Sequence, residues 1–282
     1  MSQLIGVHGI GNQYRGRAQI LNKWVPALTD GLHWAIGHPP TNPPDLDLAF
    51  YGHLFRSAAD PSSKGPTDKQ DAAELADLDA EELGELTEAV QEIVRADDLA
   101  YADAEIGRDK ALLWLPIPIA RLTGAVERRF PRASGTMVLR VLRQVRGYLR
   151  NPQLKAEVDR IAATAAAGCT VLIGHSLGSV VAYEYLRQHP GQPVKLLLTV
   201  GSPLGLRMVR DRLPPGQASV ATWVNVRDPN DPVTAAGPLG RWYPGGSDGQ
   251  ADNGLDAHSA ERYLSSKAVG RALIDVVPEL GQ

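Results

Sequence analysis

The sequence predicts an α/β protein in which helices cover both faces of a mostly parallel central sheet. Three observations lead to this class. Short apolar runs alternate with segments of helical periodicity. Two of these runs end in glycine-rich turns directly before a helical segment. The 282 residues are 43% hydrophobic and 22% charged, as in ordinary globular proteins. Parallel sheets bind ligands at the carboxyl ends of their strands, so we expect the site residues there.

The beginning of the chain is predicted to fold as strand, glycine turn, helix and strand. Residues 4–7 are apolar and lead into HGIG at 8–11, and residues 17–32 carry apolar side chains at helical spacing. Residues 45–55 follow a proline-rich turn, and their apolar and aromatic content predicts a second buried strand.

Residues 57–144 are predicted to form a helical cap inserted into a single domain that spans 1–282. Residues 68–105 hold 14 acidic and two basic side chains, with leucine, valine and isoleucine every three to five residues, which is typical of amphipathic helices with an acidic face. Residues 121–155 reverse this balance, with nine basic side chains and one acidic. Four of these arginines share one side of a helix. We favour a solvated face, or one that pairs with the acidic helices; an anionic ligand or a membrane surface is the alternative.

An apolar segment, residues 111–122, separates the two charged stretches. Its prolines, Pro116 and Pro118, are expected to prevent a regular helix. The segment is therefore predicted either to pack in the core or to form the lip of a pocket.

The second half of the chain returns to regular alternation. We expect helices at 157–167, 179–188 and 259–277, and buried strands at 170–173, 194–200 and 219–226. Strands that alternate with helices in this way form parallel sheets.

Composition excludes several classes of protein. The net charge is −3, and the few aromatic residues are not interleaved with the arginines, so no nucleic-acid partner is expected. The single cysteine, Cys169, can form neither an internal disulfide nor a cysteine metal cluster, and we interpret it as a small core residue. No apolar run reaches about 18 residues and the N-terminus lacks a signal-peptide pattern, so the expected location is the cytoplasm.

The strongest chemical signal is GHSLG at 174–178. It directly follows the predicted strand at 170–173 and directly precedes a helix, which is the context of a nucleophile elbow. Such a turn holds Ser176 in a strained backbone conformation with its hydroxyl exposed, and the glycines allow strand and helix to approach closely. A glycine-rich helix start without catalysis is the alternative.

The elbow segment VLIGHSLGSVVAYEYL resembles the α/β-hydrolase family, and in particular its small lipases and lipase-like esterases. VHGIG at 7–11 resembles the loop that supplies half of the oxyanion hole in those enzymes. The resemblance covers residues 1–56 and about 145–282; it leaves the charged insertion unmatched, and the family's usual leading hairpin strands are missing. It implies an α/β-hydrolase fold and an oxyanion hole made by the backbone N–H groups of Ile10 and Leu177, with no cofactor. For the glycines of 7–11, a plain turn or a phosphate-binding loop is the alternative, although neither nucleotide-binding glycine motif is present.

A serine nucleophile needs a base, and the family order along the chain is Ser, then Asp or Glu, then His. Only one of the seven histidines, His258, lies beyond the last predicted strand, at the start of the terminal helix. We therefore expect His258 to be the general base; a surface histidine that caps a helix is the alternative. His8 is expected to be structural.

The loop after the last predicted strand offers two aspartates, Asp228 and Asp231. Asp231 is favoured because NDPV at 230–233 resembles a pattern that the family often shows here, while Asp228, Asp252 and Asp256 stay as alternatives. The acid accepts the imidazole N–H and stabilises the imidazolium.

Other candidate residues receive structural interpretations. Ser202 is followed by Pro203, which has no N–H for an oxyanion, so we expect a strand end that lines the pocket. No His, Cys, Asp and Glu cluster has the spacing of a metal site, and His33 and His38 lack the His-Glu-x-x-His arrangement, so no metal is expected.

Taken together, these patterns predict a cytoplasmic serine esterase that forms an acyl-enzyme on Ser176 and acts on a small or lipid-like acyl ester. From apolar composition alone, Trp114 and Leu115 are the candidate substrate-binding residues, in an acyl pocket or a lid. An acyltransferase, thioesterase or cyclase with the same residues is one alternative, and a binding scaffold with an idle triad is another. The sequence indicates neither the physiological substrate nor the oligomeric state.

Overall fold

A computed structural model describes residues 4–56, 75, 77–106, 115–213 and 218–282. These residues build one sheet of six parallel strands in the order β2-β1-β3-β4-β5-β6. The strands are β1 (Leu4–Val7), β2 (Leu46–Ala49), β3 (Val171–His175), β4 (Leu196–Val200), β5 (Thr222–Arg227) and β6 (Gly246–Gln250). The predicted α/β class with a parallel sheet is thereby confirmed.

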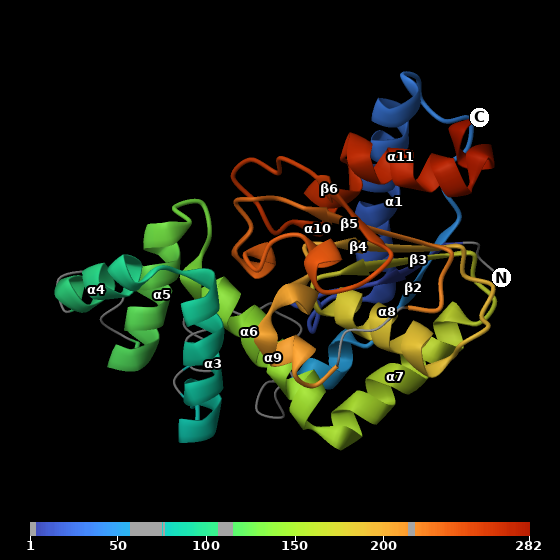
Figure 1. Cartoon of the computed structure of the whole chain (residues 1–282). Coiled ribbons are helices and arrows are strands. Elements are labelled where there is room, and N and C mark those ends of the chain that lie inside the picture. The colour runs from blue at the N-terminus through green and yellow to red at the C-terminus, as the bar shows by residue number, and fades with distance from the viewer. Residues whose placement is uncertain (1–3, 57–74, 76, 107–114, 214–217) are drawn as a thin grey trace.

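Helices cover both faces of the sheet (Figure 1). One face carries α1 (Arg17–Ile36), α10 (Ala260–Leu264) and α11 (Lys267–Val276), and the other carries α7 (Pro152–Ala166) and α8 (Leu177–Gln188). In β3, Ile173 packs with the first set of helices and Leu172 with the second, and Leu198 and Leu197 do the same in β4. Successive strand side chains point to opposite faces, so a strand covered on both sides is apolar throughout.

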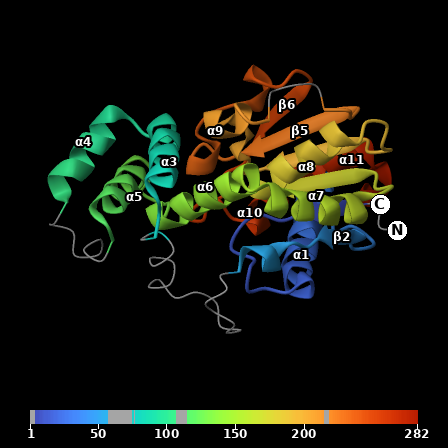
Figure 2. The ribbon, with the colours of Figure 1, turned by 90° about the horizontal axis from the view of Figure 1, so that it is seen from below.

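The insertion stands to one side of the sheet (Figures 1 and 2). Its described helices are α3 (Ala80–Ile93), α4 (Ala96–Glu105), α5 (Ile117–Arg129) and α6 (Gly135–Arg150), whose last residues return to the main body. α6 packs on α7 and α8, and both α3 and α6 contact α9 (Arg207–Arg210), which follows the carboxyl end of β4. The insertion is therefore attached at the edge of the sheet where ligands of parallel sheets bind.

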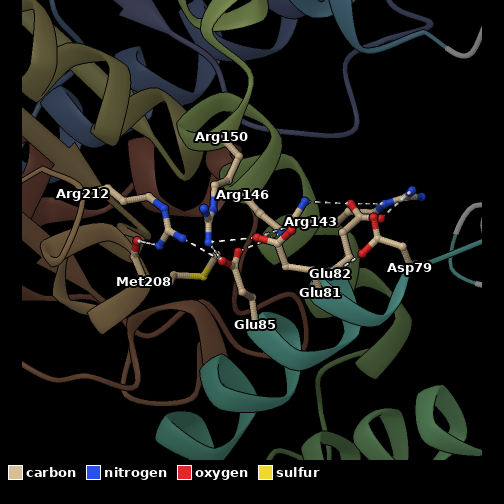
Figure 3. A network of polar contacts seen from close by, with 9 residues as sticks. All are labelled: Asp79, Glu81, Glu82, Glu85, Arg143, Arg146, Arg150, Met208 and Arg212. Atoms are coloured by element: carbon tan, nitrogen blue, oxygen red, sulfur yellow. Dashed lines mark hydrogen bonds and ion pairs between the residues drawn. The ribbon is translucent and has the colours of Figure 1, made fainter.

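Ion pairs fix α3 on α6 and on the residues after α9 (Figure 3). The Arg146 side chain is 12% exposed and lies 2.8 Å from Glu85 and 3.3 Å from Glu82. Further pairs are Arg143–Glu82, Arg150–Glu85, Arg212–Glu85, and those of Glu81 with Arg146 and Arg150. Burial raises the pKa of Glu85, but the hydrogen bond from Arg150 and the nearby arginine charges outweigh burial and lower it. Three of the four arginines on this face of α6, Arg143, Arg146 and Arg150, thus pair with the acidic helix, as the favoured interpretation expected.

The expectation that the prolines prevent a helix in 111–122 is wrong from residue 117 onward. α5 begins at Ile117, with Pro116 at its N-cap and Pro118 in its first turn. The N–H groups of a first turn have no partner within the helix, so a proline there removes no hydrogen bond. Residues 107–114 lie outside the described part of the chain.

Other elements and boundaries also differ from the prediction. The strand expected over 45–55 ends at Ala49 and is followed by a 3-10 turn, Gly52–Phe55. The terminal helix is divided into α10 and α11, and Ser266 caps the second through a bond from the Val269 N–H. β6 was not expected, because its sequence GSDGQ contains no apolar side chain. It is an edge strand held by polar contacts, including one from Asn225 Nδ2 to Asp248 Oδ1.

Candidate active site

The turn between β3 and α8 holds Ser176 in an unusual backbone conformation. Its φ is 54° and its ψ is −126°, and among the described residues no other non-glycine residue has a positive φ. Such a conformation costs about 1–3 kcal/mol and persists only where the surroundings impose it. Here the Ser176 N–H donates to the Val200 carbonyl, 3.1 Å away, and the Ser176 carbonyl accepts from the Ser179 N–H.

The glycines on either side of Ser176 are needed for close packing. A Cβ at Gly174 would lie 2.6 Å from the Gly178 carbonyl oxygen, and a Cβ at Gly178 would lie 1.9 Å from the Val7 carbonyl oxygen. Both contacts are with backbone atoms, which cannot turn away. The two glycines therefore let α8 start directly against β3 and β1.

Three side chains from distant parts of the sequence form a hydrogen-bonded line. The Ser176 hydroxyl lies 2.9 Å from Nε2 of His258, and Nδ1 of His258 lies 2.8 Å from Oδ2 of Asp231. Ser176 follows β3, Asp231 follows β5, and His258 precedes α10, so all three lie at the carboxyl-end edge of the sheet. An imidazole that donates through Nδ1 has an unprotonated Nε2, which can accept the serine proton.

The structure distinguishes between the candidate acids. Asp231 contacts His258, whereas the Asp228 carboxylate accepts the N–H groups of Asn230, at 2.7 Å, and Asn253, at 2.6 Å. Asp228 thereby ties the loop after β5 to the loop before His258. Asp252 and Asp256, the remaining alternatives, are exposed.

The expectation of an exposed serine hydroxyl is wrong in this conformation, because Ser176 is 0% exposed. The loop after β1 covers it closely, since a Cβ at Gly9 would lie 2.7 Å from the Ser176 Cβ. Asn12 fixes this loop by donating its side-chain N–H groups to the carbonyls of Gly9 and Ile10. Asn12 was not among the predicted residues; its one sequence signal is its position directly after the second glycine of the turn.

The two expected oxyanion donors lie on this loop and on α8. Ile10 follows Gly9, and Leu177 is the first residue of α8, so its N–H has no partner within the helix. His8 is buried as a structural residue: its Nε2 accepts the Tyr51 N–H and its Nδ1 donates to the Gly9 carbonyl, 2.7 Å away. Burial lowers the pKa of His8 to about 4, so its ring is neutral at neutral pH.

Two further residues support His258 and were not predicted. His175 donates from Nε2 to the His258 carbonyl, 2.9 Å away, and burial followed by the nearby His258 charge lowers the pKa of His175 well below its ordinary value. Tyr263 donates its hydroxyl to Asp231 Oδ2 at 2.8 Å. The one available sequence signal was position: His175 directly precedes the serine, and Tyr263 lies in the helix that begins just after His258.

The remaining predicted residues lie outside the hydrogen-bonded line formed by Asp231, His258 and Ser176. Leu115 is buried in the apolar cluster that joins the insertion to the sheet, and Trp114 falls outside the described residues. Ser202 accepts the Leu204 N–H and caps the short turn after β4. Cys169 is buried, which raises the pKa of its thiol to about 11 and makes the thiolate scarce at neutral pH.

The described residues contain no group of three or more His, Cys, Asp and Glu side chains placed to hold a metal ion. Among the described helices, none combines the length and the apolar character that a membrane crossing requires. No known protein family, curated protein or solved structure matches the chain.

Proposed function

We propose that this protein is a serine hydrolase of carboxylic esters with an α/β-hydrolase fold. The observation that carries the proposal is the hydrogen-bonded line Asp231–His258–Ser176. It is supported by the positive φ of the serine and by the position of that serine between a parallel strand and a helix. Such a line can activate the serine, because the imidazole takes the hydroxyl proton as the nucleophile attacks.

In the proposed reaction, Ser176 Oγ attacks the ester carbonyl carbon while His258 Nε2 takes the hydroxyl proton. Asp231 holds the imidazole in the required tautomer and stabilises the imidazolium. The N–H groups of Ile10 and Leu177 bind the oxyanion of the tetrahedral intermediate. His258 then gives its proton to the departing alcohol, which leaves an acyl-enzyme on Ser176, and water activated by His258 releases the acid.

The burial of Ser176 favours acyl transfer as a second candidate function. The serine is 0% exposed, and an acyl-enzyme kept from water survives long enough for an alcohol, amine or thiol to accept the acyl group. Product analysis with and without an added alcohol distinguishes the two: hydrolysis yields only the acid, and transfer yields the new ester.

The test of the proposal is labelling with a fluorophosphonate probe, together with turnover of p-nitrophenyl esters of increasing acyl length. Ser176→Ala and His258→Ala should lose labelling and reduce turnover by about 10⁴- to 10⁶-fold, and Asp231→Asn should reduce it by about 10⁴-fold. Ser202→Ala is the matched control, because Ser202 follows the neighbouring strand β4 and caps a turn; it should label like the wild type.

Two outcomes would overturn the proposal. Labelling that moves to Ser202 or survives in Ser176→Ala would show that the nucleophile is elsewhere. A wild-type protein that neither labels nor turns over any ester in the series would favour the binding-scaffold alternative.

A further inference from the structure

Tyr263 links the two aspartates of the loop after β5. It is fully buried on α10, and its hydroxyl oxygen lies 2.9 Å from the Asp228 backbone nitrogen and 2.8 Å from Asp231 Oδ2. A backbone N–H can only donate, so the hydroxyl oxygen accepts from Asp228 and its proton is directed to Asp231. The direction of the Tyr263–Asp231 hydrogen bond is therefore fixed by its second partner.

This bond falls on the same carboxylate oxygen that His258 uses. Asp231 Oδ2 accepts from Tyr263 and from His258 Nδ1, and Oδ1 accepts the Val233 N–H at 3.0 Å. The terminal torsion of an aspartate is broad, so an unrestrained carboxylate can rotate. Hydrogen-bond donors on both oxygens hold the plane of the Asp231 carboxylate in one orientation. The Tyr263 hydroxyl also draws away part of the negative charge of the oxygen that faces the imidazole.

We propose that Tyr263 is a positioning residue that orients the Asp231 carboxylate toward His258 and withdraws part of its charge. The inference rests on the proposed hydrolase function, because it assigns how the acid of that site is held. Burial, followed by the charge of Asp231, raises the pKa of Tyr263 far above its ordinary value, so the phenol remains a donor at any working pH.

The groups around His258 allow the effect of Tyr263 on the charge of Asp231 to be measured. Its ring faces Ser176 and Asp231, and the His175 ring lies 4.9 Å away between centroids. His175 is neutral because burial lowers its pKa, and Asp228 is engaged with two backbone N–H groups. Loss of the Tyr263 hydroxyl removes the donor to Asp231 Oδ2 and also the acceptor of the Asp228 N–H. The first of these changes raises the charge density on Asp231, next to the imidazole. A denser negative charge favours the imidazolium, so His258 should protonate at higher pH.

The experiment compares Tyr263→Phe with Tyr148→Phe. Tyr148 is the matched control, because it is also buried and donates its hydroxyl to a carboxylate, Asp159, at 2.6 Å. The readouts are kcat and KM for a p-nitrophenyl ester, the pH profile of kcat, and the pH midpoint of the His258 ring signal followed by NMR.

Tyr263→Phe should lower kcat about 10- to 100-fold with less than about a twofold change in KM. It should also move the low-pH limb of the kcat profile and the NMR midpoint upward by about half a unit. Tyr148→Phe should leave all these quantities unchanged. A folded Tyr263→Phe protein with wild-type kcat and an unmoved midpoint would overturn the inference.

A second variant tests the inference if the Tyr263→Phe protein fails to fold. Replacement of Tyr263 by 3-fluorotyrosine keeps the hydroxyl and makes it a stronger donor, so the NMR midpoint should move downward; no movement would count against the inference. The NMR midpoint needs no turnover. A wild type that neither labels with the fluorophosphonate probe nor turns over any ester therefore overturns the proposed function, while the midpoints still decide the role of Tyr263.

Discussion

Replacement of Gly178 by alanine tests whether the contact between the elbow and β1 constrains the site. Gly178 is the second residue of α8, and an added Cβ would lie 1.9 Å from the Val7 carbonyl oxygen and 2.8 Å from that of His8. Carbon–oxygen contacts in proteins are about 3.3 Å or longer. The backbone of β1 or of α8 must therefore move by more than about 1 Å.

The movement should cost both stability and activity. Val7 pairs with Gly174 on one side and with Ala49 on the other, so a shift of β1 disturbs two strand ladders. Overpacking typically costs about 1–3 kcal/mol, and a clash with backbone belongs at the upper end of that range, so we expect a loss of about 3 kcal/mol or more in unfolding free energy. The loop that carries Ile10 follows β1, and a displacement of about 1 Å there should reduce ester turnover about 100-fold.

Urea unfolding and ester turnover measure the two effects. Gly84→Ala is the control, because Gly84 is exposed within α3 and a Cβ there would meet nothing within 4 Å. That substitution should raise the unfolding free energy by about 0.5–1 kcal/mol. A Gly178→Ala protein that loses less than about 1 kcal/mol in unfolding free energy and keeps full turnover would refute the predicted constraint.

Two further predictions concern stability. Arg146→Ala leaves Glu82 and Glu85 without their central partner in a partly buried network and should cost about 1–2 kcal/mol, whereas Arg160→Ala, in an exposed pair, should change the unfolding free energy by less than about 0.5 kcal/mol; equal losses in urea unfolding would refute this. Burial lowers the pKa of His8 to about 4, so between about pH 6.5 and pH 4 the unfolded chain binds this proton and the folded protein does not. His8 should therefore contribute a decrease of about 3 kcal/mol in the unfolding free energy as the pH falls through that interval, in addition to the decrease from His175, whose pKa burial also lowers. His8→Asn should remove the His8 part of the decrease; an unchanged slope would contradict the role given to burial.

Much of the sheet could be predicted because its strands carry their own signal. β1, β3 and β4 are short apolar runs between glycine-rich turns and helices, and burial on both faces requires that composition. β6 could not be predicted in this way, since it is held by backbone pairing with β5 and by the contact between Asn225 and Asp248. The prediction failed at Pro118 for a different reason. Whether a proline disrupts a helix depends on its position in that helix, and the N-cap sets where the helix begins.

The sequence by itself determined the local chemistry of the elbow. A strand, a serine between glycines and a helix follow one another without a gap, and the strained turn is a property of that short segment. Only the tertiary structure decided which aspartate faces His258, that Tyr263 shares the same carboxylate oxygen, and that the loop after β1 covers Ser176. These contacts join residues far apart in the chain, so their distances depend on how the strands pair and the helices pack rather than on any local pattern.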